Sequence, residues 1–177
     1  MPNLITFLRI LIVPILFSVL LYYEPQRDYL RVEAFWLFLF GSITDAVDGL
    51  VARLGKKTTE LGRFLDPLAD KLLLLSGYLG IFMAKDFPLL PPVWILVTIV
   101  FRDLVITGGL VVFYMSGRKV KVQPNFLGKA TTAIQMATLI SILLLFPISP
   151  LLWNVAVFLT VASGLTYVIQ AMKHARR

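Results

Sequence analysis

The chain has 177 residues and a formal net charge of +7, and 58% of its residues are hydrophobic, with a mean hydropathy of +0.84. A soluble domain of this length could not bury so much apolar surface, so the composition indicates an integral membrane protein. Membrane topology and anionic lipid headgroups then explain the basic charge better than nucleic acid does, and the absence of cysteine excludes disulfides and thiolate chemistry.

Six apolar runs follow one another along the chain, each near the length of about 20 residues that a membrane helix requires. They cover residues 4–23, 32–54, 61–84, 91–115, 126–146 and 151–172. Short polar links separate them and leave no room for a soluble domain. The sequence therefore predicts one all-α integral membrane domain over residues 1–177, with six transmembrane helices.

Lysine and arginine are distributed unequally between the two sides of this predicted bundle. Basic residues gather in the link after the second run, in the link after the fourth run, and at the C-terminus, whereas the opposite side holds Arg27, Arg31 and Lys85. The positive-inside rule then predicts that both termini are cytoplasmic. The link between the second and third runs is predicted to lie at the same face.

Four aspartates flank that link. Asp45 and Asp48 lie three residues apart at the end of the second run, and Asp66 and Asp70 lie four apart at the start of the third. Each pair therefore shares one face of a helix, and a short link makes the two helices neighbours. Two carboxylates about 4 Å apart repel by about 4 kcal/mol at an effective dielectric of 20. Four of them in one pocket require cations.

Divalent ions suit such a cluster because Mg²⁺ prefers oxygen ligands and completes its shell with water and phosphate. Two divalent ions about 3.5 to 4 Å apart clamp the oxygens of a displacement at phosphorus. The alternative is a salt-bridged cluster with Arg53, Arg63 and Lys71. We favour the metal site.

Small residues and one arginine accompany the aspartates. Gly49 and Ala52 keep one helix face narrow, so that a ligand or another helix can approach closely. Gly62 could admit a flat base near the start of the third run. Arg53 can bind a phosphate through two hydrogen bonds. These residues fit a nucleotide diphosphate.

The stretch from residue 45 to residue 70 reads D-x-x-D-G-x-x-A-R, eight residues, then G-x-x-x-D-x-x-x-D. It resembles the signature of the CDP-alcohol phosphotransferases, membrane enzymes that transfer a phosphoalcohol from a CDP carrier to an acceptor hydroxyl and release CMP. The resemblance implies that Asp45, Asp48 and Asp66 bind two divalent cations, Mg²⁺ or Mn²⁺. It implies that Asp70 completes the metal site and acts as general base. The residues that it assigns to the CDP moiety are Gly49, Ala52, Arg53 and Gly62.

Two further segments resemble the phosphatidylglycerophosphate synthase branch of this family. The opening MPNLITFLR is similar to its P-N-x-x-T-x-x-R motif, and GKATTAIQ is similar to its G-K-x-x-T-x-x-Q segment. The likeness implies CDP-diacylglycerol as donor and glycerol 3-phosphate as acceptor, and it places Asn3, Thr6 and Arg9 near the site. Arg9 could bind substrate phosphate or instead snorkel to the headgroups. Further candidates for binding the acceptor phosphate are Arg102, Lys119, Lys121 and Lys129, although the positive-inside excess could also explain the lysines.

The segment FRDLVITGGLV departs from that branch, because Asp103 replaces an expected glutamate and Leu110 an expected arginine. In this respect it also resembles the CMP-forming cardiolipin synthases, whose acceptor is phosphatidylglycerol. The family resemblance further implies a homodimer among membrane lipids, and the compact chain suggests a bacterial inner membrane with a cytoplasmic active site. A divalent-ion transporter is an alternative of another class, since intramembrane carboxylates often mark ion pathways.

Overall fold

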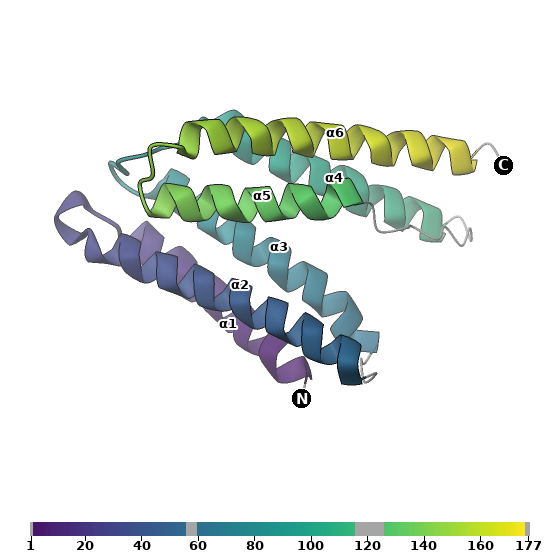
Figure 1. The fold of residues 1–177 in the computed structure, drawn as a ribbon, viewed down its shortest axis with the longest axis horizontal. Helices are drawn as coiled ribbons and strands as arrows, with labels where there is room; N and C mark the ends of the chain where they lie inside the picture. The colour runs from purple at the N-terminus through teal and green to yellow at the C-terminus, as the bar shows by residue number, and fades with distance from the viewer. Residues whose placement is uncertain (1, 56–59, 116–125, 176–177) are drawn as a thin grey trace. The chain divides into compact units, whose positions relative to one another are not determined.

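The computed structural model of the chain describes the backbone of residues 2–55, 60–115 and 126–175, and most of their side chains outside 45–67. These residues form six α-helices and one short 3₁₀ turn, without a strand (Figure 1). The helices are α1 (Pro2–Leu21), α2 (Tyr29–Gly55), α3 (Glu60–Met83), α4 (Val93–Met115), α5 (Phe126–Leu143) and α6 (Ser149–Ala175), and the turn η1 (Pro25–Arg27) joins α1 to α2. The predicted all-α class is confirmed, and each predicted apolar run corresponds to one helix.

The chain divides into two compact units. The first unit contains residues 1–90 and 139–146, which form α1, α2, α3 and the end of α5. The second contains residues 91–138 and 147–177, which form α4, the rest of α5, and α6.

In the first unit, α1 contacts both α2 and α3, and α2 contacts α3. Leu20 of α1 lies at the contact with α3, and Leu16 and Leu73 are likewise fully buried. The two helices come very close at Gly80 of α3, where a Cβ atom would lie 2.7 Å from the Cβ of Leu20. Because a Cβ atom cannot swing away as the tip of a side chain can, this position of α3 requires glycine.

The fifth helix ends at Leu143, three residues before its apolar run does. Leu145 has a φ of 55°, in the left-handed region that terminates many helices. The N–H of Phe146 donates to the carbonyl of Ser141 over 2.9 Å, and that of Leu145 donates to Ile142 over 3.0 Å. This pair of bonds is a Schellman motif, which hydropathy does not reveal because both turn residues are apolar.

An arginine ties the link between α1 and α2 to the end of α5. Arg31 donates through Nε and Nη2 to the two carboxylate oxygens of Asp28, over 2.7 and 2.6 Å. Its Nη1 donates to the backbone carbonyl of Leu143. A cation at the C-terminus of a helix satisfies a free carbonyl and interacts favourably with the helix dipole.

The second unit has a polar seam between α5 and α6. Gln135 Nε2 donates to Thr160 Oγ1 over 2.8 Å, and Thr131 Oγ1 donates to the carbonyl of Leu159 over 3.1 Å. These polar side chains are buried. The fourth helix contacts α6 as well.

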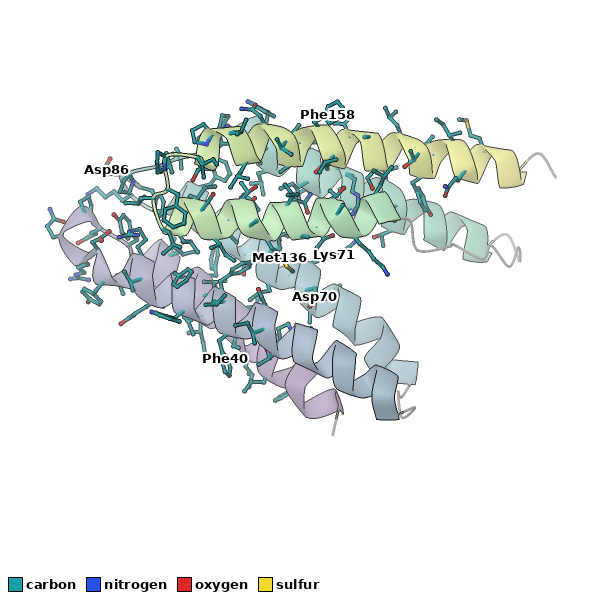
Figure 2. All side chains as sticks on the ribbon, viewed as in Figure 1. Phe40, Asp70, Lys71, Asp86, Met136 and Phe158 are labelled. Atoms are coloured by element: carbon teal, nitrogen blue, oxygen red, sulfur yellow. The ribbon has the colours of Figure 1, made fainter. Side chains whose placement is uncertain are left out.

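Large apolar side chains cover the outer helix faces, including Phe40 on α2 and Phe158 on α6, which are 53% and 73% exposed (Figure 2). Within the described residues, one segment, Ser149–Gln170, is long and apolar enough by itself to cross a membrane. Phe7–Leu21 and Leu127–Leu143 are shorter apolar helices. The predicted helices are thus confirmed, whereas six membrane crossings stay a prediction.

Candidate functional site

The aspartates of the signature lie on two helices that contact each other. Asp45 and Asp48 belong to the C-terminal part of α2, and Asp66 and Asp70 belong to the N-terminal part of α3. The side chain of Asp70 is described, and those of the other three aspartates lie outside the described set. The described side chains include no group of three potential metal ligands, so the predicted metal site stays a prediction.

Close packing joins α2 and α3 beside these aspartates. A Cβ atom on Gly41, four residues before Asp45, would lie 2.8 Å from Cδ2 of Leu73, three residues after Asp70. The two helices therefore approach each other within about one helical turn of the carboxylate-bearing positions. This is the neighbouring arrangement that the short link predicts.

The first helix contributes an arginine to the same region. Nη1 of Arg9 donates to Oδ1 of Asp70 over 2.6 Å, which makes an ion pair between α1 and α3. The side chain of Arg9 is 1% exposed and that of Asp70 is 26% exposed; Figure 2 labels Asp70 on α3. The sequence singles out both residues, but not their pairing, because 61 positions separate them and only the packing of α1 on α3 brings them together.

The remaining predicted residues of this region are placed on helices by their backbone. Gly49, Ala52 and Arg53 belong to α2, and Gly62 belongs to α3. Asn3 and Thr6 belong to the first two turns of α1. Their side-chain environments lie outside the described set. The predicted contacts with CDP and with the acceptor therefore remain predictions.

In the second unit, Arg102 of α4 is largely buried and is held on two sides. Its Nη1 donates to Oδ1 of the adjacent Asp103 over 2.7 Å, and its Nη2 donates to Oγ of Ser163 on α6 over 3.0 Å. Its Nε is buried and has no acceptor among the described residues. A buried donor without an acceptor destabilises the folded state unless a ligand or water accepts its hydrogen bond.

Two glycines leave room for this guanidinium group. A Cβ on Gly128 would lie 3.4 Å from Nη2 of Arg102, and one on Gly164 would lie 3.6 Å from its Cγ. Sequence reasoning missed Ser163; the signal that could have found it is its place beside Gly164 in the membrane-length apolar run of residues 151–172. Lys129 is exposed on α5, next to Gly128, whereas Lys119 and Lys121 lie outside the described residues.

Comparison with known proteins identifies relatives along almost the entire chain. The sequence model of the CDP-alcohol phosphatidyltransferase family matches residues 1–166. The CDP-diacylglycerol--glycerol-3-phosphate 3-phosphatidyltransferase of Bacillus subtilis (strain 168) is 36% identical in an alignment 187 residues long, which includes 94% of this chain and 92% of the relative. A probable phosphatidylglycerophosphate synthase of Mycobacterium tuberculosis (strain ATCC 25618 / H37Rv) is 34% identical over 179 residues, covering 98% of this chain and 82% of the relative.

A third relative carries a different name. A probable cardiolipin synthase (CMP-forming) of Drosophila melanogaster is 31% identical over 191 residues, which cover 95% of this chain and 56% of that protein. The match of the family model to nearly the full length, together with the bacterial relatives, confirms the resemblance found in the signature. The chain is a transferase and belongs to the CDP-alcohol phosphatidyltransferase family.

Proposed function

We propose that this chain is an integral membrane phosphatidyltransferase that uses CDP-diacylglycerol as donor and glycerol 3-phosphate as acceptor, releasing CMP. The structural observation that carries the proposal is the meeting of α1, α2 and α3 beside the signature aspartates, where Arg9 pairs with Asp70 and Gly41 packs on Leu73. The names of the Bacillus and Mycobacterium relatives support the choice of donor and product.

The signature residues divide between the cations and the nucleotide. Asp45, Asp48, Asp66 and Asp70 fit two divalent cations, Mg²⁺ or Mn²⁺, because carboxylates from two closely packed helices supply only hard oxygen ligands. When bound, such cations balance the negative charge of the pyrophosphate. The CDP moiety lies against Gly49, Ala52 and Gly62. Arg53 donates hydrogen bonds to a phosphate.

Asp70 acts as the general base. Its side chain is 26% exposed, so an acceptor hydroxyl can reach the carboxylate. The hydroxyl oxygen attacks the phosphorus atom that carries the diacylglycerol, its proton passes to Asp70, and the bond from that phosphorus to CMP breaks. A carboxylate within hydrogen-bond reach of the attacking group typically contributes about 100- to 10,000-fold to the rate.

Candidates for binding the acceptor phosphate are basic and polar residues, of which Arg102 is the best supported. Its buried Nε has no acceptor among the described residues, and a phosphate oxygen would supply one. The other basic or polar residues that we assign to the acceptor are Asn3, Thr6, Lys119, Lys121 and Lys129. Phosphatidylglycerol is the second candidate acceptor, favoured by Asp103 in place of glutamate and by the Drosophila relative.

All six helices are proposed to lie in the lipid bilayer. Exposed Phe, Trp and Leu side chains on the described outer faces support this, for example Trp36, Phe101 and Phe158. The distribution of lysine and arginine supports cytoplasmic termini and a cytoplasmic active site, in a bacterial inner membrane. A homodimer within the membrane completes the proposal.

The purified chain in lipid nanodiscs should be given CDP-diacylglycerol, Mg²⁺ or Mn²⁺, and one acceptor at a time, with CMP release measured and the lipid product identified by mass spectrometry. Glycerol 3-phosphate should give CMP and phosphatidylglycerophosphate in equal amounts. Product with phosphatidylglycerol alone would assign the chain to the cardiolipin synthases. Divalent-ion flux into proteoliposomes without CMP release would contradict the proposal and favour a transporter.

A further inference from the structure

The ion pair between Arg9 and Asp70 joins an inaccessible cation to an accessible carboxylate. Arg9 is 1% exposed and Asp70 is 26% exposed, and the bond between Nη1 and Oδ1 is 2.6 Å long. In this arrangement the arginine side chain is covered by protein, whereas a ligand can reach the aspartate. Arg9 can therefore act on the reaction through its bond to Asp70.

The interface between α1 and α3 holds the arginine in place. Seven residues after Arg9, Leu16 is fully buried, and Leu20 packs one turn further along. At Gly80 of α3, α1 approaches so closely that a Cβ atom would lie 2.7 Å from Leu20. This packing holds the backbone of α1 against α3, and the 1% exposure of Arg9 leaves its side chain little room to move.

The chemical nature of arginine suits this task. Its planar, permanently charged fork presents donors at fixed angles, and less conformational freedom is lost for each hydrogen bond than with lysine. A donor that is itself immobile restricts the rotamer of the carboxylate that it binds. A displacement of about 1 Å in a catalytic group can reduce a rate by about 100-fold.

We propose that Arg9 is a positioning residue that fixes the Asp70 carboxylate in the orientation required to accept the proton of the acceptor alcohol. The inference rests on the proposed function of Asp70, and it gives Arg9 a role other than the direct contact with substrate phosphate that the sequence suggests. On this proposal, α1 also helps to orient the base Asp70, through Arg9, which lies outside the aspartate signature.

The test compares Arg9→Gln with Arg31→Gln in the full chain in nanodiscs. Both wild-type arginines pair with an aspartate in the first unit, so the second variant is a matched control for the loss of an arginine ion pair. The steady-state rate of CMP release is measured against the concentrations of CDP-diacylglycerol and of acceptor. Arg9→Gln should lower kcat by about 100-fold and change both KM values by less than about 3-fold.

Arg9→Lys should recover part of the lost kcat, because lysine keeps the charge but not the fork, and Arg31→Gln should have a kcat within about 2-fold of the wild type. A rise in the KM for either substrate with unchanged kcat would overturn the proposal, since it would mean that Arg9 binds substrate directly. So would a kcat of Arg9→Gln equal to that of the wild type. If the wild-type chain releases no CMP with any acceptor, the proposed function itself fails.

A second measurement applies even if Arg9→Gln does not fold. Arg9→Lys and Asp70→Glu are made singly and together, and kcat and the midpoint of thermal unfolding are measured for all four proteins. If Arg9 acts through Asp70, the double variant should lose at least about 3-fold less kcat than the product of the two single losses predicts. The proposal would be overturned if the kcat loss of the double variant equalled the product of the two single losses and its shift in unfolding midpoint equalled their sum. The two residues would then be uncoupled.

Discussion

Two arginine–aspartate pairs in the first unit have the same chemistry and very different surroundings. Arg9 bonds to Asp70 on another helix, and their side chains are 1% and 26% exposed. Arg31 bonds to Asp28 three residues away, and their side chains are 13% and 50% exposed. Arg9 lies about 18 Å along α1 from the end of that helix, at 1.5 Å per residue, and the second pair lies just beyond that end. We infer that the more buried pair, which joins distant segments, constrains the proposed base, whereas the more exposed local pair secures a link.

The largest expected effect follows from Asp70→Asn, which removes the proposed base from the more buried pair. CMP release should fall by about 100- to 10,000-fold, while CDP binding in the presence of Mn²⁺ is retained in part. Asp28→Asn is the matched control and should leave turnover within about 2-fold of the wild type. Isothermal titration with CDP and a CMP-release assay give the two quantities. Near-normal turnover of Asp70→Asn would remove its assignment as base.

Arg53→Ala tests whether the arginine of the signature binds the nucleotide or only stabilises the fold. The variant should weaken the binding of CDP-diacylglycerol by about 1.5 to 3 kcal/mol, the scale of a hydrogen bond to a charged group. The quantity to measure is the Kd of the donor in nanodiscs with Mg²⁺ present. An unchanged Kd would mean that Arg53 packs against the protein or extends to the headgroups.

Gly80→Ala tests the close packing of α1, the helix that carries Arg9, on α3. The added Cβ would lie 2.7 Å from the Leu20 Cβ, so we expect a loss of about 1 to 3 kcal/mol in the free energy of unfolding. Gly41→Ala is the control, because its added atom meets the Cδ2 of Leu73, the movable tip of a side chain. The loss of stability that Gly41→Ala causes by crowding Leu73 is offset by the better helix propensity of alanine, which contributes about 1 kcal/mol. In detergent, Gly80→Ala should have a lower free energy of unfolding than Gly41→Ala. The reverse order would contradict the close packing of α1 on α3 at Gly80.

The smallest effect concerns the exposed pair and its dependence on pH. The hydrogen bonds from Arg31 lower the pKa of Asp28 below its ordinary value of 3.8. An aspartate whose pKa is depressed in the folded state stabilises the fold above that ordinary value, and this contribution is lost as the pH falls through the folded-state pKa. Asp28→Asn should therefore lower the free energy of unfolding by no more than about 0.5 kcal/mol at neutral pH, because the side chain of Asp28 is half exposed. The difference in unfolding midpoint between wild type and variant should shrink between about pH 6 and about pH 3, and a difference that grows on acidification would contradict the assignment.

The order of the helices could be predicted from the sequence because each apolar run is bounded by polar links. The second run, predicted over 32–54, is the helix Tyr29–Gly55. Pairings between distant residues could not be predicted: hydropathy marks Arg9 as costly in lipid but does not say that Asp70 is its partner. The early end of α5 at Leu143 also escaped prediction, because the left-handed turn at Leu145 is made by a residue that usually avoids that conformation. The signature could be recognised because its spacing is fixed, and the acceptor could not, because the basic residues that would bind it also serve topology.

The central claim is that Asp70 stands beside paired cations at the meeting of α1, α2 and α3. The most direct test is a crystal structure with Mn²⁺ and CDP-diacylglycerol in which anomalous scattering locates the metal ions. The account predicts two anomalous peaks about 3.5 to 4 Å apart, ligated by the signature aspartates, with Arg9 still bonded to Asp70. Peaks ligated by other residues, or an Asp70 side chain turned away from both Mn²⁺ and Arg9, would contradict it.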